Sequence, residues 1–161
     1  MKNKNVLFLT QSAMIAAIYV VLTILFRPFS FGEIQVRIAE ALTILPLFTP
    51  AAIPGLFVGC LVGNIFGGGP LPDIVFGSLA TLLGAIFTYL LRNRSRFLAP
   101  LPPIISNTII IPFVLRYAYG TNLPIYWMMI TVGIGEVVSC GILGMILCSS
   151  LWKYRHKIFH M

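Results

Sequence analysis

The sequence predicts an all-α integral membrane protein: one domain over residues 1–161, folded as six transmembrane helices with both termini in the cytoplasm. Composition is the first reason, since 58% of the residues are apolar, 9% are charged and the mean hydropathy is +0.97. A soluble domain of this length needs no such excess, whereas a bundle surrounded by lipid does. The other two reasons are the six apolar segments of the chain and the places where its basic residues gather.

The first three expected helices cover residues 6–26, 35–48 and 54–66. The first follows two lysines, as a signal peptide would, but it is long enough to span and no small-x-small cleavage site follows it. We therefore expect it to be retained as a helix, which ends at Arg27-Pro28. The second and third segments are short for full spans, and this predicts tilted, broken or partly re-entrant helices.

The last three expected helices cover residues 73–91, 103–119 and 124–151. The run Gly67-Gly68-Gly69-Pro70 separates the fourth helix from the third, and three arginines separate it from the fifth. Pro112 lies inside the fifth helix and predicts a kink there.

The basic residues give the orientation of these helices. Eight of the eleven form three clusters: Lys2 and Lys4; Arg92, Arg94 and Arg96; Lys153, Arg155 and Lys157. Six spans place all three clusters on one side, which the positive-inside rule identifies as the cytoplasm, whereas an odd number of spans would split them. The other three, Arg27, Arg37 and Arg116, fall at or near the opposite face.

The sequence gives no support for an enzyme. Both histidines lie in the final tail, and the three cysteines sit in apolar runs without metal-ligand spacing, where we interpret them as small packing residues. Neither a phosphate-binding loop nor a Gly-x-Ser-x-Gly motif occurs. We therefore expect no catalytic residue, no metal and no cofactor. The net charge of +7 comes mainly from the clusters at the membrane edges and does not indicate nucleic-acid binding.

The acidic residues are the strongest functional signal. Only four occur: Glu33, Glu40, Asp73 and Glu136. A carboxylate at bilayer depth costs roughly 2.5 kcal/mol or more, so it indicates a functional site by default. The predicted topology brings these acids together with Arg37, Asn64 and Asn107, mostly in the outer half or at the midplane. This predicts a pocket that opens outward rather than a continuous polar pore.

Several of these polar residues also have a structural interpretation. Arg37 could neutralise the glutamates four positions before and three positions after it on one helix face. Asp73 follows Pro72 at a helix start and could cap the free N–H groups. Asn64 and Asn107 could form hydrogen bonds between helices. Glu136 has no basic residue within four positions, which makes it the strongest candidate for binding a ligand.

Small residues predict two close-packing faces. Glycines at positions 55, 59, 63 and 67 share one face of the third helix, where a neighbouring helix can approach closely. Ala13 and Ala17 share a face of the first helix. The second pair fits either packing inside the bundle or docking of another membrane subunit, and the spacing alone leaves both open.

Residues 31–42, which read FGEIQVRIAEAL, together with Pro46, the glycines of the third helix and the run Asn64-Ile65-Phe66-Gly67, resemble the QueT family. Those proteins are queuosine-precursor transporters, and they are substrate-binding (S) components of energy-coupling factor (ECF) transporters. The resemblance extends over essentially the whole chain in length, span count and topology, and it is strongest from Phe31 to Pro72.

The resemblance implies a place and partners for the chain. S components lie in the bacterial plasma membrane as six-helix proteins with cytoplasmic termini, and they bind a micronutrient near the outer face. They dock to a transmembrane T component, itself joined to two cytoplasmic ATPase subunits, through alanines that Ala13 and Ala17 match. The loop between the first two helices acts as a lid, which here is residues 27–35, including Phe29, Phe31 and Glu33.

The substrates implied are 7-deazaguanines, notably 7-aminomethyl-7-deazaguanine. A carboxylate suits the two parallel donors of the guanine edge, a second carboxylate suits the cationic aminomethyl group, and Asn or Arg can donate to the 6-oxo group. The flat ring favours an aromatic platform, for which Phe66, Tyr117, Tyr126 and Trp127 are candidates. The substrate-binding residues we expect are Glu40, Glu136, Asn64, Asp73, Asn107, Arg37 and Trp127, with their individual roles left open.

Two other functions compete with this one. An S component for another vitamin would share every feature except the cargo. A stand-alone small-solute channel or transporter is less consistent with the sequence, because the inner half of the bundle has almost no buried charge and the chain shows no internal repeat.

Overall fold

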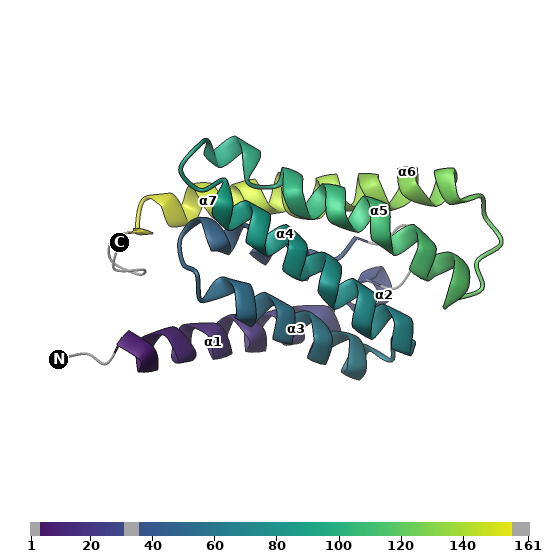
Figure 1. The fold of residues 1–161 in the computed structure, drawn as a ribbon, viewed down its shortest axis with the longest axis horizontal. Coiled ribbons are helices and arrows are strands. Elements are labelled where there is room, and N and C mark those ends of the chain that lie inside the picture. The colour runs from purple at the N-terminus through teal and green to yellow at the C-terminus, as the bar shows by residue number, and fades with distance from the viewer. Residues whose placement is uncertain (1–3, 31–35, 156–161) are drawn as a thin grey trace.

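The structure is a computed structural model that describes residues 4–30 and 36–155. Over these residues the chain is all-helical, and its main helical segments are six, as predicted (Figure 1). They are α1 (Lys4–Leu25), η1 (Ile38–Leu47), α3 (Ala52–Gly67), η2 with α4 (Asp73–Gly77 and Ser78–Leu90), α5 (Leu101–Tyr117), and α6 with η4 and α7 (Ile125–Glu136, Val137–Leu143 and Gly144–Trp152). Two short helices, α2 (Arg27–Ser30) and η3 (Arg96–Leu98), lie between them.

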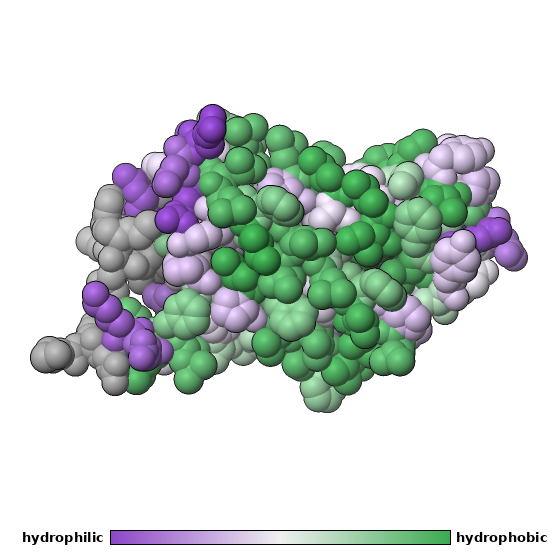
Figure 2. All heavy atoms as spheres, in the orientation of Figure 1, coloured by the Kyte–Doolittle hydropathy of each residue, from purple (hydrophilic) through white to green (hydrophobic). Residues whose placement is uncertain are grey.

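Four helical stretches are long and apolar enough to cross a membrane. They are Lys4–Leu25, Asp73–Leu90, Arg96–Tyr117 and Ile125–Trp152, whereas Ile38–Leu47 and Ala52–Gly67 are shorter, as the sequence predicted. Figure 2 shows the consequence on one face of the molecule, where apolar side chains cover the middle and hydrophilic ones gather at the two ends of the long axis. This is the surface of a multi-pass membrane protein.

The short helix η1 differs most from expectation. We expected a helix over residues 35–48, but the described helix begins at Ile38 and is a 3₁₀ helix of 10 residues with Pro46 inside it. It contacts α1, α3, α4, η4 and α7, and residues 39–47 are all buried. At about 2.0 Å per residue a 3₁₀ helix rises faster than an α-helix, so ten residues reach farther through the bundle centre.

Helices α1 and α3 lie against each other through the predicted glycine face. A Cβ atom added at Gly55 would lie 2.8 Å from the Ser12 carbonyl oxygen, and one at Gly59 would lie 2.8 Å from the Tyr19 Cβ. At Gly63 the nearest atom would be the Thr23 hydroxyl oxygen, at 3.2 Å. The predicted packing role of Gly55, Gly59 and Gly63 is therefore confirmed, and it fixes the face of α1 that turns inward.

This contact gives a first testable prediction. Gly59→Ala should destabilise the purified protein by about 1–3 kcal/mol, because the new methyl group meets Tyr19 and the Ala16 backbone, which has little freedom to move. Gly133→Ala is the matched control, since its Cβ would meet only the Thr108 side chain, at 3.5 Å or more. Unfolding of both variants in detergent checks this, and equal stabilities would contradict the tight α1–α3 contact.

Both ends of the described chain lie at the same end of the bundle (Figure 1). The connection between α4 and α5, which carries Arg92, Arg94 and Arg96, also lies at that end, whereas the connection between α5 and α6 lies at the other. An even number of passes requires this arrangement. That the shared end faces the cytoplasm remains a prediction from the basic clusters.

Candidate functional site

Six buried polar residues from five segments of the fold meet inside the apolar bundle. Each is at most 5% exposed, and they come from the N-terminal end of η1, from α3, from η2, from α5 and from α6: Arg37, Glu40, Asn64, Asp73, Asn107 and Glu136. All six were expected to bind substrate. They form two clusters, joined through Thr81 and Cys60: the Thr81 hydroxyl oxygen lies 3.2 Å from Glu40 Oε1 and 3.4 Å from Cys60 Sγ, and Asn64 Nδ2 lies 3.7 Å from the same sulfur.

The first cluster, the Arg37–Asp73 cluster, consists of Arg37, Asn64, Asp73 and Tyr119. Arg37 Nη2 lies 3.3 Å from Asp73 Oδ2 as an ion pair and donates to Asn64 Oδ1 at 3.1 Å. Asn64 Nδ2 donates to the Asp73 carbonyl at 3.2 Å, and the Tyr119 hydroxyl donates to Asp73 Oδ2 at 2.7 Å. Burial, and then the neighbouring Asp73 charge, raise the pKa of the Tyr119 phenol, which keeps it a hydrogen-bond donor.

This cluster bears on two structural interpretations. Arg37 forms an ion pair with Asp73 across the bundle, and because its backbone is extended (φ −87°, ψ 96°) the helical i,i+3 pairing expected with Glu40 does not apply. Glu33, the other glutamate expected beside Arg37, lies outside the described residues. The Asp73 carboxylate accepts hydrogen bonds from Arg37 and Tyr119 instead of capping a helix end. Gly77 permits this packing, since a Cβ there would lie 2.8 Å from Asp73 Oδ1.

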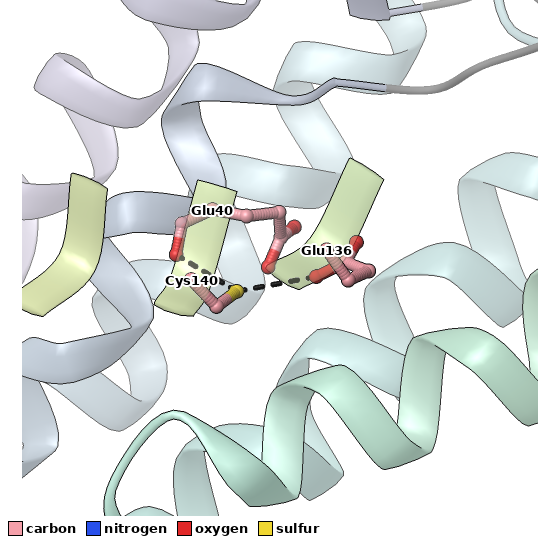
Figure 3. A group of neighbouring side chains, drawn as sticks. All are labelled: Glu40, Glu136 and Cys140. Atoms are coloured by element: carbon pink, nitrogen blue, oxygen red, sulfur yellow. Dashed lines mark hydrogen bonds between the residues drawn. The ribbon is translucent and has the colours of Figure 1, made fainter. Parts of the chain in front are cut away.

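The second cluster, the Glu40–Glu136 cluster, is built around two carboxylates. Glu40 is 0% exposed, and its Oε1 accepts hydrogen bonds from the Tyr19 phenol and from Thr81. Glu136 is 3% exposed, and it accepts from Asn107 Nδ2 at 3.0 Å and from Cys140 Sγ at 3.1 Å. The Glu40 carboxylate turns toward Glu136 and Cys140 (Figure 3).

The atoms of Glu40, Glu136 and Cys140 that could coordinate a metal ion, a carboxylate oxygen from each glutamate and the cysteine sulfur, all lie within 4.8 Å of one another. Within the described residues they are the group with the geometry to hold a metal ion. Sequence spacing gave no indication of this, because Glu40 lies almost a hundred positions before the other two. We interpreted Cys140 as a packing residue, yet its thiol lies 3.1 Å from Glu136 Oε2, 3.4 Å from the Glu40 carbonyl and 3.3 Å from the Thr43 hydroxyl.

Tyr19 is the site residue that the sequence analysis missed most clearly. It lies on the buried face of α1 with Ser12, Ile15 and Thr23, and its hydroxyl crosses to Glu40. One feature of the sequence could have indicated this role: Tyr19 carries a hydroxyl group and lies on a different face of α1 from Ala13 and Ala17, which are exposed.

The expected aromatic platform is not at the site. Phe66, Tyr117, Tyr126 and Trp127 are 68%, 80%, 68% and 50% exposed, respectively, on the outer surface of the bundle. Their helical positions turn outward, so the structure does not bring Trp127 to the other six predicted residues. Of the predicted lid residues, Phe31 and Glu33 lie outside the described residues, and Phe29 lies in α2.

The predicted docking residues lie on the outer side of α1. Ala13 and Ala17 are exposed. Beside them a groove runs between α1 and α3, and its lining includes Ala13, Ala16 and Gly55. Because both alanines are exposed, packing inside the bundle does not account for Ala13 or Ala17.

Comparisons with known proteins agree with the resemblance seen in the sequence. A model of the QueT transporter family matches residues 9–153. The queuosine precursor transporter QueT of Lactococcus lactis subsp. cremoris (strain MG1363) is 31% identical over 96 residues, which are 58% of this chain and 56% of that protein. The match thus spans little more than half of either chain. No solved structure matches significantly.

Proposed function

This chain belongs to the QueT transporter family, and we propose that it is the substrate-binding S component of an ECF transporter in the bacterial plasma membrane, where it imports a queuosine precursor of the 7-deazaguanine class. The observation that carries the proposal is the pair of buried polar clusters inside an otherwise apolar bundle. Buried charge in a membrane domain is costly, and it is kept where it binds something. A family of transporters also agrees with the expectation that the chain is not an enzyme.

The chemistry of the clusters suits a guanine-like ring. Carboxylates accept hydrogen bonds from the ring N–H and from the exocyclic amine, and an amide or guanidinium donates to the 6-oxo group. Glu40 and Glu136 supply acceptors, while Asn107 and Arg37 supply donors. Most of these polar atoms are paired within the protein, so a ligand must exchange its own donors and acceptors for some of those partners.

Titration of the purified protein tests this function. We expect 7-aminomethyl-7-deazaguanine to bind and hypoxanthine to be rejected strongly, because hypoxanthine lacks the exocyclic amine and leaves a buried acceptor unpaired. Binding of another vitamin and of no 7-deazaguanine would move the chain to a different S-component cargo. Uptake that does not need the ATPase subunits would instead support a stand-alone transporter.

A substitution at Glu136 tests the site itself. Glu136→Gln keeps the shape of the side chain but turns one acceptor into a donor that faces ligand donors. Because each charge-assisted hydrogen bond contributes about 1.5–3 kcal/mol, affinity for the aminomethyl base should fall at least about tenfold. Calorimetric titration measures this. Gln11→Glu is a useful control outside the site, since Gln11 lies on α1 and contacts Thr49.

The outer face of α1 supports the docking part of the proposal. Exposed small residues allow a partner helix to approach closely in a membrane. Ala13 and Ala17 are such residues, and the groove that Ala13 lines gives a partner side chain a place to insert. We therefore propose this face as the contact with the T component, which joins the chain to two ATPase subunits.

A further inference from the structure

The three described acidic residues differ in whether a cationic side chain compensates their negative charge. Asp73 has a cationic partner in Arg37, at 3.3 Å, and a phenol donor in Tyr119, at 2.7 Å. Its negative charge is therefore balanced within the protein. A ligand cation that approached Asp73 would have to compete with a buried arginine.

Glu40 and Glu136 have no such balance. Among the described residues neither carboxylate lies within ion-pair distance of a lysine or arginine, and all their hydrogen-bond donors are neutral: the Tyr19 phenol, the Thr81 hydroxyl, the Asn107 amide and the Cys140 thiol. Glu40 Oε2 is buried and accepts no hydrogen bond from any described residue. Two carboxylates this close repel each other, and a buried acceptor without a donor is costly.

We propose that Glu40 and Glu136 form the seat of a primary ammonium group of the ligand, a site we call the amine seat. The assignment rests on the proposed function and names the part of the substrate that these two residues bind. An ammonium has three N–H donors and a positive charge. It can therefore donate to Glu136 and to Glu40 Oε2, the carboxylate oxygen of this pair that accepts no hydrogen bond from the described residues.

The proposal separates two ligands that differ in one substituent. The aminomethyl base carries the ammonium, whereas 7-cyano-7-deazaguanine carries a neutral nitrile that has only an acceptor to offer. In the amine seat the nitrile nitrogen would face carboxylate lone pairs. The wild-type protein should therefore bind the aminomethyl base at least about tenfold more tightly than the cyano base.

The test is the ratio of these two affinities in matched variants. Glu40→Gln and Glu136→Gln should each reduce the preference for the aminomethyl base several-fold, because each removes one of the two charges that the ammonium meets. Asp73→Asn weakens the Arg37 ion pair, so it should lower the unfolding temperature and weaken binding of both bases to a similar extent, which leaves the ratio of their affinities as it is in the wild type. Calorimetric titration gives the ratios, and thermal unfolding identifies any variant that fails to fold.

Each outcome decides something different. If neither base binds the wild type, the proposed function itself fails. If both bind equally, or if Asp73→Asn alone removes the preference, the 7-deazaguanine function stands and the amine seat is wrong. The carboxylates and thiol would instead be a metal site if Zn²⁺ or Mg²⁺ alone raised the unfolding temperature, Glu136→Gln removed that effect, and the two bases bound alike.

Discussion

Arg37→Met should destabilise the purified protein by about 3–5 kcal/mol, because it leaves the Asp73 charge buried without its cation. Arg37 and Asp73 are 5% and 1% exposed, so water cannot replace the lost partner. The Tyr119 hydroxyl would remain as a donor to Asp73, but a neutral donor compensates a buried charge only in part. Chemical unfolding in detergent measures the change.

Two further variants make this result specific. Arg37→Met combined with Asp73→Leu should recover much of the loss, since replacing both members of a buried pair by apolar residues is often close to neutral. Arg116→Met is the matched control, because Arg116 is exposed and its hydrogen bonds go to the backbone carbonyls of Thr121 and Leu123. A large loss in the control, or none in Arg37→Met, would show that the ion pair is not what stabilises this end of η1.

The helices could be predicted because each is bounded by residues that act locally. Proline, glycine and charge interrupt helices or apolar runs whatever surrounds them, so the six segments matched expectation closely. The conformation of η1 could not be predicted in this way. It is a 3₁₀ helix buried on all sides, and what fixes it is contact with the neighbouring elements rather than its own propensity.

The site was predictable in its charged residues and not in their partners. A charge in an apolar segment is visible in the sequence, and the topology brought Glu40, Asp73 and Glu136 together. Which of these carboxylates has a cationic partner depends on distances between segments that lie far apart in the chain. Tyr19 and Cys140 were missed because a phenol or a thiol in an apolar helix is ordinary until its neighbour is known. Two π-helical segments, η2 and η4, carry Asp73 and Cys140 and shift the helix register locally, which no periodicity argument anticipates.

Helix α1 links the two halves of the proposed function. Its inner face carries Tyr19, which donates to Glu40, and α3 holds that face tightly through Gly59. Its outer face carries Ala13 and Ala17. Since one helix has both faces, substitutions can separate substrate binding from docking.

Ala13→Leu combined with Ala17→Leu should abolish uptake while ligand binding to the purified protein stays nearly intact. Both alanines are exposed, so the added bulk meets no neighbour inside the bundle, but it fills the surface where a partner helix must come close. Met14→Leu with Ile18→Leu is the matched control, because these exposed residues have the same spacing on α1 and are already large. Uptake of labelled base by cells that produce the T component and ATPases, set beside titration of each purified variant, separates the effects. If binding collapsed together with uptake, the two alanines would belong to the packing of this chain and not to its docking surface.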